Sequence, residues 1–408
     1  MNEKGRYQGK ETVGVLSMQC VILAAGKGTR MQPLTYTRSK VMIPIANKPS
    51  IEWLVSCLDF CEEIIIVVNK SQKDVIAYFN DNKKIKFVFQ DKPLGTAHAL
   101  LQCEKLIHDK FLLINGDELF PKHDIQNISK KEPFTISTFR VKDPENYGVV
   151  IIEDGKIKDI IEKQDPPQSD IARCGLDLLD ERVFDAIKKT GKSERGEYEL
   201  PDAYRLLIKG IAFRQYEVSN WISISYPWNI LDANRFILDI YGSQIEKCEM
   251  RPGAVIESPV SIGSESVIGP NCFIRKYSSI GKNCKVGQAV EIKNSIIMDN
   301  TYVSHLSYVG DSIIGSSCNI GGGAMFANLR LDDKNIKMEI NDQRIDTGKQ
   351  KLGGLVGDNV KFGVNVTVMP GKRIWPNLLV PPCMTVTEDI KEQIALGSPE
   401  MVKNKCVV

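Results

Sequence analysis

The chain lacks any apolar run long enough to cross a membrane, and its first residues contain no apolar signal core. It also lacks an excess of one charge, because 53 Lys and Arg face 51 Asp and Glu. That balance argues against a nucleic-acid groove or an anionic membrane patch as the main binding surface. The eleven cysteines occur without a CxxC pair or zinc-ligand spacing, which indicates reduced thiols in a cytoplasmic protein.

A length of 408 residues predicts two or three domains, each able to bury its own core. Residues 1–17, MNEKGRYQGKETVGVLS, are polar and aperiodic, and Met18 directly precedes the first apolar segment. We therefore expect residues 1–17 to form a disordered extension, or translation to start at Met18.

Up to about Tyr241, apolar segments alternate with helical ones. Buried strands are predicted at Cys20–Ile22, Ile64–Lys70, Lys84–Gln90 and Lys110–Asp117, with a helix at Lys73–Phe79. This rhythm predicts a mostly parallel sheet covered by helices. Ligands bind such sheets beyond the carboxyl ends of the strands.

A glycine-rich segment, LAAGKGTRMQPLT (residues 23–35), follows the first predicted strand. Gly26 and Gly28 let the backbone approach phosphate oxygens, and Arg30 and Lys40 supply positive charge nearby. No GK[ST] ends the segment and its glycine spacing is not that of the dinucleotide fingerprint. It predicts a phosphate-binding loop of another kind, although a simple tight turn is the alternative for the glycines taken alone.

Near residue 250 the period of the sequence changes to six. Bulky apolar residues occupy every sixth position at Ile256, Ile262, Ile268, Ile274, Ile280, Val286, Ile292 and Met298. After an interruption at about residues 327–354 the period resumes at Val356, Phe362, Val368, Ile374, Val380 and Val386. Six is not a helical period, and it predicts a hexapeptide-repeat parallel β-helix whose triangular coils share one aliphatic core. The interruption has the length of a functional loop, and Asn229–Glu246 is predicted as a helix joining the halves.

A nucleotidyltransferase half followed by a hexapeptide half resembles the bifunctional GlmU-type enzymes, especially archaeal sugar-1-phosphate nucleotidylyltransferase/acetyltransferases. The resemblance covers essentially everything after Met18. It implies an α/β dinucleotide-fold nucleotidyltransferase domain (18–228), a linker helix (229–249), a left-handed β-helix acyltransferase domain (250–390) and a tail (391–408). It also implies a homotrimer with two activities. These are acetyl-CoA-dependent N-acetylation of glucosamine-1-phosphate and uridylyl transfer from UTP to N-acetylglucosamine-1-phosphate, which gives UDP-N-acetylglucosamine.

The first half resembles the family's nucleotide site. The matching nucleotide-binding positions are Leu23, Ala24, Gly26, Gly28, Thr29, Gln90, Gly95 and Thr96, with Arg30 and Lys40 as catalytic cations. Asp117, in an NGD sequence, matches the Mg²⁺ aspartate, although a helix cap is the alternative for it alone. Gly148 and Glu162, with their neighbours Tyr147 and Lys163, match sugar contacts. The sugar phosphate is an anionic nucleophile that needs no general base, so cations that hold two phosphates in line suffice.

Two positions depart from the family's pattern. Ser223 stands where a second metal carboxylate or amide is usual, and Ser225 where glycine is usual. Arg173 stands where an asparagine contacts the sugar, and we expect it to clash with the sugar or grip its phosphate. These departures keep open a non-catalytic regulatory subunit of the same family. Because Gln90 does not separate uracil from thymine, UTP and dTTP both stay open, as does a glucose-1-phosphate thymidylyl- or uridylyltransferase.

The second half resembles the family's acetyltransferase site. His305, in SHLSYVGD, matches the catalytic histidine, because a base must deprotonate an amine before it attacks a thioester. The substrate-binding positions are matched by Arg275, Lys293, Tyr308, Asn319, Asn328, Lys334 and Lys337. An outward surface histidine is the alternative for His305. Val364 stands where the family often has a small hydroxyl residue near acetyl-CoA.

Overall fold

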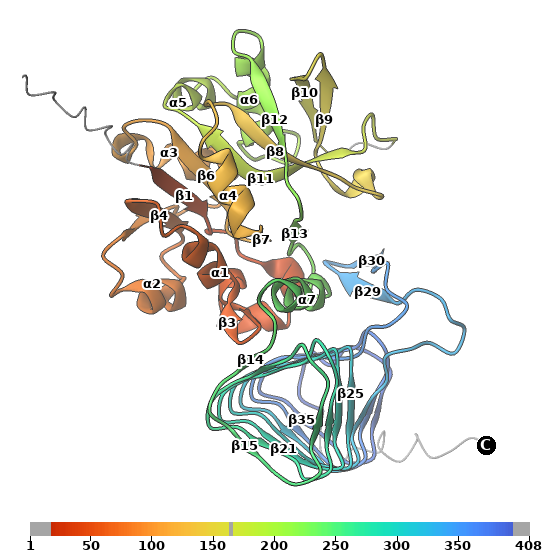
Figure 1. Ribbon diagram of the computed structural model, residues 1–408. Coiled ribbons are helices and arrows are strands. Elements are labelled where there is room, and N and C mark those ends of the chain that lie inside the picture. The colour runs from red at the N-terminus through yellow and green to blue at the C-terminus, as the bar shows by residue number, and fades with distance from the viewer. Residues whose placement is uncertain (1–17, 163–165, 395–408) are drawn as a thin grey trace, which may run out of the picture.

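The computed structural model describes residues 18–162 and 166–394. The predicted disordered extension (1–17), Lys163 and residues 395–408 of the predicted tail lie outside the described residues. Figure 1 shows an α/β body and a triangular coil of short strands, with α7 (Asn229–Tyr241) between them. Of the helices in the described residues, none is long and apolar enough to cross a membrane.

The α/β body is built on one nine-stranded sheet in the order β5-β4-β1-β6-β11-β8-β12-β10-β9. Its strands are β1 Gln19–Leu23, β4 Glu63–Val68, β5 Ile85–Phe89, β6 Phe111–Asn115, β8 Thr135–Arg140, β9 Val149–Glu153, β10 Lys156–Ile161, β11 Ile171–Leu179 and β12 Phe213–Glu217. Strands β5, β4, β1 and β6 are parallel, whereas β11 runs antiparallel to both β6 and β8. The prediction of a mostly parallel sheet is therefore wrong beyond β6. Tight turns such as Asp154–Gly155, between β9 and β10, join antiparallel strands without a crossover helix.

Short helices cover both faces of this sheet. They are α1 Ser50–Cys57, α2 Lys73–Phe79, α3 Thr96–Leu101, α4 Lys122–Ile128, α5 Arg182–Ile187 and α6 Leu200–Ile208. Successive side chains of a strand point to opposite faces, so Ile22 and Val21 of β1 belong to two different apolar clusters. The central strands are thus buried on both sides. Because β5, β4, β1 and β6 run parallel, their carboxyl ends lie together at one edge of the sheet, where ligands bind.

The coil has three faces, and each is a seven-stranded parallel sheet. The first face contains β14 Gln244–Ile245, β17 Ser261–Ile262, β20 Ser279–Ile280, β23 Ile296–Ile297, β26 Ile313–Ile314, β31 Leu355–Val356 and β34 Arg373–Ile374. The second face contains β15 Glu249–Met250, β18 Val267–Ile268, β21 Lys285–Gln288, β24 Tyr302–His305, β27 Asn319–Ile320, β32 Lys361–Phe362 and β35 Leu379–Val380. The third face contains β16 Val255–Ile256, β19 Phe273–Ile274, β22 Glu291–Lys293, β25 Tyr308–Gly310, β28 Met325–Phe326, β33 Thr367–Val368 and β36 Thr385–Val386. The chain visits the faces in turn, as in the predicted parallel β-helix, while the hand of the coil stays a prediction.

The predicted six-residue positions form the core of the coil up to Ile292, and again from Val356 onward. The prediction is wrong at Met298, because Ile280 pairs with Ile297 and one turn of the coil is a residue shorter than the one before. A one-residue shift moves a side chain to the opposite face of a strand. Ile297 therefore packs inside the coil, whereas Met298 joins the apolar cluster of the α/β body.

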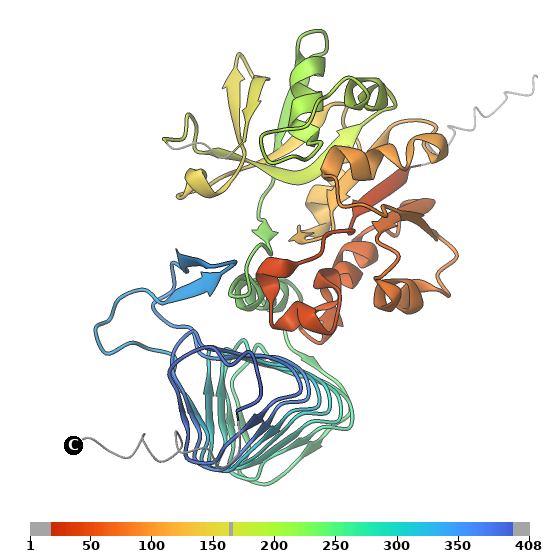
Figure 2. The same ribbon diagram turned by 180° about the vertical axis from the view of Figure 1, so that it is seen from behind.

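Between β28 and β31 the chain leaves the coil as an insertion. It contains the antiparallel hairpin of β29 (Lys337–Ile340) and β30 (Gln343–Asp346). Both views show this hairpin beside α7 rather than within the coil (Figures 1 and 2). The Nζ of Lys349 lies 2.6 Å from Oδ1 of Asp232 in α7, which ties the insertion to the helix.

The predicted joining helix is shorter than expected. Helix α7 ends at Tyr241, and Gly242 follows with a φ of 71°, a conformation that glycine adopts without strain. Gln244 and Ile245 already form β14, the first strand of the coil. The predictions of a helix up to Glu246, and of a linker helix up to 249, are therefore wrong from Gly242 onward, because β14 and β15 already belong to the coil.

The first face of the coil packs on the α/β body. Ile296, Met298, Ile313 and Leu355 belong to the same apolar cluster as the helices and strands of that body. Buried Asn234 of α7 bridges the two parts, because its side-chain oxygen accepts from Ala46 N (2.8 Å) and from Ser279 Oγ (2.7 Å). The two parts are thus joined by a continuous interface as well as by one helix.

Candidate functional site

A cleft of about 560 Å³ opens at the carboxyl ends of β1 and β6. The predicted nucleotide-site residues that line it are Leu23, Ala24, Gly26, Gly28, Thr29, Arg30, Lys40, Gln90, Gly95, Thr96 and Asp117. Segments far apart in the sequence therefore meet at one cavity, as the resemblance implies. The role of each residue stays a prediction.

Gly28 lets Lys40, the lysine predicted to bind phosphate, approach the cleft. Its φ of 65° lies in the left-handed region, and a Cβ built on it would lie 2.9 Å from Cβ of Lys40. The hydroxyl of Thr35 donates to Gly28 O at 2.7 Å and closes the loop. Lys40 then reaches across the cleft, where its ammonium forms an ion pair with Asp117. A larger residue at position 28 would push the lysine away from this carboxylate.

Gln90 is buried and held in a fixed orientation. Its amide nitrogen donates to Gly95 O at 3.0 Å and lies 3.0 Å from Nδ1 of His98. Burial lowers the pKa of His98, which favours the neutral ring that accepts this hydrogen bond. His98 therefore orients Gln90. The contact could have been suspected from the short sequence distance between the two residues.

Glu118 is a residue of the cleft that the sequence analysis missed. It is buried directly behind Asp117 and accepts hydrogen bonds from Asn115 Nδ2 (3.0 Å), Gly175 N (2.8 Å) and Trp221 Nε1 (2.6 Å). Burial, and secondarily the charge of Asp117, raises the pKa of Glu118 to about 7. The acidic pair in NGDE was the signal that could have indicated it.

Ser223 lies opposite Glu118. The resemblance predicts a second metal ligand at the position of this serine. The two residues pair across β13 (Ile222–Ser223) and β7 (Glu118–Leu119). Ser223 Oγ lies 3.1 Å from Ser225 Oγ, and both hydroxyls line the cleft. Among the described residues there is no group of three or more His, Cys, Asp or Glu side chains placed to hold a metal. Any ion bound here would therefore take most of its ligands from substrate and water.

The side chain of Arg173 points into the α/β body, and its expected contact with the sugar stays a prediction. Its guanidinium is buried in an ion pair with Asp177, and its carbon Cζ lies 5.1 Å from the ring centre of Tyr204. The hydroxyl of Tyr204 donates to Asp177 Oδ2 at 2.8 Å. The arginine is turned inward because β11 and α6 place an acid and an aromatic ring beneath it.

The two predicted sugar residues lie together but outside the lining of the cleft found in the described residues. A Cβ on Gly148 would be 3.7 Å from the Glu162 carboxylate, so the two are neighbours. Glu162 lies 3.5 Å from Nη2 of Arg195. The structure therefore places them as one pair at the rim of the α/β body.

In the coil, several predicted acetyltransferase residues meet on the third face. Asn328 Nδ2 donates to the hydroxyl of Tyr308 at 3.2 Å, and its second partner is Asp311. Lys293 Nζ lies 3.7 Å from Asp311 Oδ2, while Arg275 Nη1 lies 3.3 Å from Glu291 Oε1. We call the residues Arg275, Lys293, Tyr308, Asp311 and Asn328 the third-face cluster.

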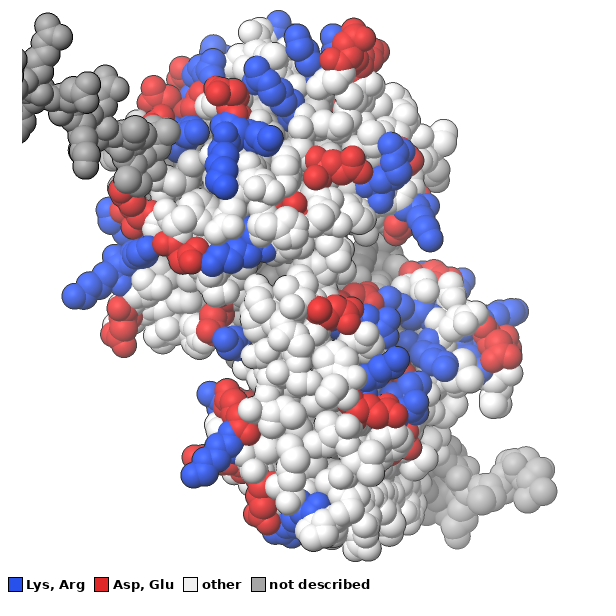
Figure 3. Space-filling view, viewed as in Figure 1, with Lys and Arg blue, Asp and Glu red and all other residues white. Residues whose placement is uncertain are grey.

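Gly310 makes the third-face cluster possible. A Cβ at this position would lie 2.4 Å from the hydroxyl of Tyr308 and 2.7 Å from Nδ2 of Asn328. Burial, and then the charges of Asp311 and Glu291, raises the pKa of Tyr308, which keeps its hydroxyl protonated. Figure 3 shows Lys and Arg side chains gathered on the coil beside the insertion, the distribution that binding of an anionic substrate requires.

The other predicted acetyltransferase residues lie apart from this cluster. His305 is exposed at the end of β24, and in the described part of the chain its ring shows no hydrogen bond or ion pair. Asn319 is exposed on the second face. Lys334 and Lys337 line a small cavity of about 280 Å³ on the insertion, with Arg330 and Arg344.

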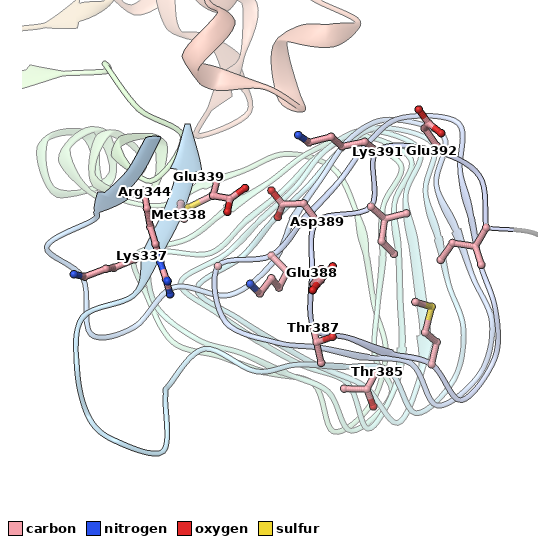
Figure 4. Close-up of a pocket in the computed structure, with 15 residues that line it drawn as sticks. Lys337, Met338, Glu339, Arg344, Thr385, Thr387, Glu388, Asp389, Lys391 and Glu392 are labelled. Atoms are coloured by element: carbon pink, nitrogen blue, oxygen red, sulfur yellow. The ribbon is translucent and has the colours of Figure 1, made fainter. Parts of the chain in front are cut away.

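Lys337 also borders a larger cavity of about 850 Å³ between the hairpin and the last turn of the coil (Figure 4). Side chains of both charges line it, among them Arg344, Lys391, Glu388 and Glu392. One chain thus presents the predicted acetyltransferase residues on separate surfaces rather than in one enclosed site.

Comparison with known proteins agrees with this architecture. A Nucleotidyl transferase family model matches residues 19–239, and a GMPPB C-terminal domain model matches residues 256–393. The chain resembles a putative glucose-1-phosphate thymidylyltransferase from Bacillus anthracis, with a TM-score of 0.51 and 30% identity over 55% of this chain and 96% of that one. A UDP-glucose pyrophosphorylase structure aligns with a TM-score of 0.50 and 25% identity over 55% of this chain and 100% of that one. The α/β body is therefore a nucleotidyl transferase domain.

Two relatives extend over both parts of the chain. The bifunctional protein GlmU of Methanocaldococcus jannaschii is 38% identical over 92% of this chain and 96% of its own length. A bifunctional sugar-1-phosphate nucleotidylyltransferase/acetyltransferase of Sulfurisphaera tokodaii is 37% identical over 91% of this chain and 98% of its own length. The chain belongs to this family of bifunctional GlmU-type proteins.

The inward ion pair yields a stability prediction. Arg173→Asn should lower the free energy of unfolding by about 3–5 kcal/mol, because it leaves the Asp177 carboxylate buried without a counter-charge. Asp177→Asn in the same chain should recover most of this loss, since no unpaired charge is left. Chemical denaturation followed by circular dichroism measures both. An Arg173→Asn protein as stable as the wild type would contradict the inward orientation.

Proposed function

We propose that the chain makes UDP-N-acetylglucosamine in two steps. It acetylates glucosamine-1-phosphate with acetyl-CoA and then transfers a uridylyl group from UTP to N-acetylglucosamine-1-phosphate. The observation that carries this proposal is the presence, in one chain, of the Lys40–Asp117 cleft and the third-face cluster. The names of the two full-length relatives support the same pair of activities.

In nucleotidyl transfer, a phosphate oxygen of the sugar phosphate attacks the α-phosphorus of UTP. A new P–O bond forms, the bond to the β-phosphate breaks, and pyrophosphate leaves. Lys40 and Arg30, on opposite ends of one loop, would offset the repulsion between the two anions and hold them in line. Backbone N–H groups around Gly26 and Gly28 would hold the triphosphate.

The residues of the cleft fit Mg²⁺. The Asp117 carboxylate is about one-third exposed to the cleft, and Mg²⁺ in such sites takes one or two carboxylates, substrate phosphates and waters. We therefore assign Asp117 to hold it. When bound, Mg²⁺ neutralises phosphate charge and orients the phosphates.

Gln90 would read the pyrimidine. Because its amide nitrogen is taken by Gly95 O and His98, the amide oxygen is left to accept from the N3–H of the base. Uracil and thymine both present that N–H, so this contact excludes neither UTP nor dTTP. The alternative of glucose-1-phosphate thymidylyl or uridylyl transfer uses the same cleft for this reason.

In acetyl transfer, the amine of glucosamine-1-phosphate attacks the thioester carbonyl. A C–N bond forms and the C–S bond breaks. His305 accepts the amine proton, which then passes to the departing coenzyme A thiolate, so that coenzyme A leaves as the thiol. Arg275 and Lys293 would hold the sugar phosphate, with Tyr308 and Asn328 beside them. Asn319 and Asn328 would lie near the amine and the acetyl carbonyl, and Lys334 and Lys337, on the insertion, would bind substrate.

Because these residues lie on separate surfaces of one chain, we propose that a left-handed coil assembles as a C3 homotrimer whose neighbours complete the acetyl-CoA site. A mass three times that of the chain is expected in light scattering. A stable monomer at micromolar concentration would contradict the assembly.

The experiment that tests the whole function is product analysis. The purified protein is incubated with acetyl-CoA, Mg²⁺, UTP or dTTP, and a panel of hexose- and amino-hexose-1-phosphates, and products are identified by mass spectrometry. We expect UDP-N-acetylglucosamine from glucosamine-1-phosphate. Products formed only from glucose-1-phosphate would favour the alternative enzyme, and no product from any combination would favour the regulatory subunit.

Removal of the metal carboxylate should abolish nucleotidyl transfer. Asp117→Asn is expected to lower kcat/KM by about 10²-fold or more, because one ligand fewer is left to orient and neutralise the phosphates. Ser223→Asp should conversely lower the Mg²⁺ concentration at half-maximal rate, since it adds a carboxylate to the cleft. Initial rates of pyrophosphate release across a Mg²⁺ titration measure both. If the rate of the Ser223→Asp protein equals that of the wild type at every Mg²⁺ concentration, the serine at position 223 does not weaken Mg²⁺ binding.

His305→Ala should lower acetylation of glucosamine-1-phosphate by about 10²–10⁴-fold, the usual contribution of a general base. Nucleotidyl transfer should be unchanged, because Arg30 and Asp117 lie in the other body. Arg275→Ala and Lys293→Ala should instead mainly raise KM, since they hold a phosphate present in both ground and transition states. Acetylation by the His305→Ala protein at the wild-type rate would rule out His305 as the base.

A further inference from the structure

The two cations assigned to the phosphates are joined by one short segment. Residues 32–40, here called the connecting segment, run from just after Arg30 to Lys40. Both cations line the cleft. The position of the connecting segment therefore sets where Lys40 stands relative to Asp117 and to a bound triphosphate.

The coil holds the middle of the connecting segment through one carboxylate. Both oxygens of Asp358, between β31 and β32, lie 2.5 Å from Nη2 of Arg38. Thr37 Oγ1 donates to Asp358 Oδ2 at 2.6 Å. Both charged side chains are largely buried, at 17% and 14% exposure. A partly buried, charge-assisted pair of this kind is stronger than a surface ion pair.

Asp358 is itself fixed within the coil. Its Oδ1 accepts from the backbone N–H of Ser316 at 2.7 Å. Arg38 makes further contacts on the same surface, with Ser316 Oγ at 3.3 Å and Met298 Sδ at 2.9 Å. Met298 is the residue that the shortened turn of the coil directs toward the α/β body. The coil thus presents a rigid, preformed partner for Arg38.

A second contact reaches the start of the connecting segment. Arg373 Nη1 donates to the backbone oxygen of Gln32 at 3.3 Å. The guanidinium is held by Asp389, with Nε 2.8 Å from Oδ2, and by the ring of Trp375 at 4.9 Å from its centre. Two residues of the coil therefore hold the connecting segment at two points.

The α/β body holds the segment on either side of Thr37 and Arg38, and Leu34 is buried in its apolar cluster. Thr35 donates to Gly28 O, and Ser39 N donates to Asp74 Oδ2 at 2.7 Å. Tyr36, between them, is 62% exposed. Side-chain partners of Thr37 and Arg38 in the described residues come from the coil.

From these contacts we propose that Asp358 is a positioning residue for nucleotidyl transfer, acting through Arg38 and Thr37 on Lys40. The proposal deepens the proposed function and rests on it. According to this proposal the coil, besides its part in acetyl transfer, also holds the connecting segment of the α/β body in place. A misplacement of about 1 Å at a catalytic group can lower the rate by as much as 10²-fold. Loss of the Arg38–Asp358 contact can therefore slow catalysis although neither residue contacts the substrate.

The test uses the full chain and compares Asp358→Asn with a matched control. Asp358→Asn keeps the shape and the acceptor for Ser316 but removes the charge that holds Arg38. Asp232→Asn removes another ion pair between the two parts, Lys349–Asp232, which does not touch the connecting segment. Pyrophosphate release, acetylation and thermal unfolding are measured for each.

We expect Asp358→Asn to lower kcat for nucleotidyl transfer by about 10-fold or more, with acetylation unchanged. Asp232→Asn should leave both activities at the wild-type level. Arg38→Met should resemble Asp358→Asn, and the double variant should be no slower than either single one, since both break the same contact. Arg38→Lys should recover part of the rate, because it keeps the charge. A wild-type kcat in Asp358→Asn, or an equal loss in Asp232→Asn, would overturn the proposal.

A second readout does not depend on turnover. Amide hydrogen exchange of residues 32–40 should become about 10-fold faster in Asp358→Asn and stay unchanged in Asp232→Asn, because the segment opens more often. Calorimetric titration with Mg²⁺ and UTP should show weaker binding in Asp358→Asn. If the wild type transfers no nucleotide to any sugar phosphate, the proposed function fails, and exchange and UTP binding still decide the role of Asp358. Unchanged exchange and unchanged UTP affinity would overturn it.

Discussion

The docking of the first face of the coil on the α/β body is the constraint on which the rest of the structure depends. Hydrophobic residues of that face, such as Ile296, Ile313 and Leu355, share a core with the nucleotidyl transferase domain. Removal of this apolar area from water stabilises the contact without specifying its geometry. The specificity comes from polar pairs set within it, chiefly Asn234 and the Arg38–Asp358 pair. The interface between the two halves therefore includes the segment that carries Lys40.

The electrostatics of the cleft follow from where the strands end. Asp117 and Glu118 come directly after β6, so two acids lie at the carboxyl edge of the sheet, opposite the cations of the glycine-rich loop. The outer acid is paired with Lys40, while the inner one is surrounded by N–H donors from Asn115, Gly175 and Trp221. Donors that converge on Glu118 hold it in place, and a cation bound in the cleft would favour its charged form over the protonated form that burial favours.

The features best predicted from the sequence are those set by a short repeat or by a local motif. The six-residue period locates the inward side chains of the coil because each turn repeats the same small unit, and the glycine-rich motif locates the cleft. The shortened turn escaped prediction because Ile296, Ile297 and Met298 are all apolar, so the pattern does not tell which one points inward. The antiparallel pairs beyond β6 escaped prediction because they join strands that are distant in the sequence, such as β6 and β11, and the residues of one strand do not fix its partner. The orientation of Arg173 depends on Tyr204, which comes from a distant helix.

Ser223 and Arg173 depart from the family's pattern, which in the sequence alone suggests a loss of function. The structure weakens that argument. Arg173 turns its side chain inward to Asp177, while its backbone N–H donates to Gly148 O at 2.8 Å beside a predicted sugar contact. Ser223 removes a carboxylate, yet Glu118 lies opposite it on the paired strand. The cleft therefore keeps two acids, of which one is exposed and one is buried and held by donors. A regulatory subunit under no catalytic demand has no need to keep a buried acid of this kind, because its desolvation costs stability. Both acids and Lys40 line the same cleft, which supports the proposal that it binds phosphates and a cation.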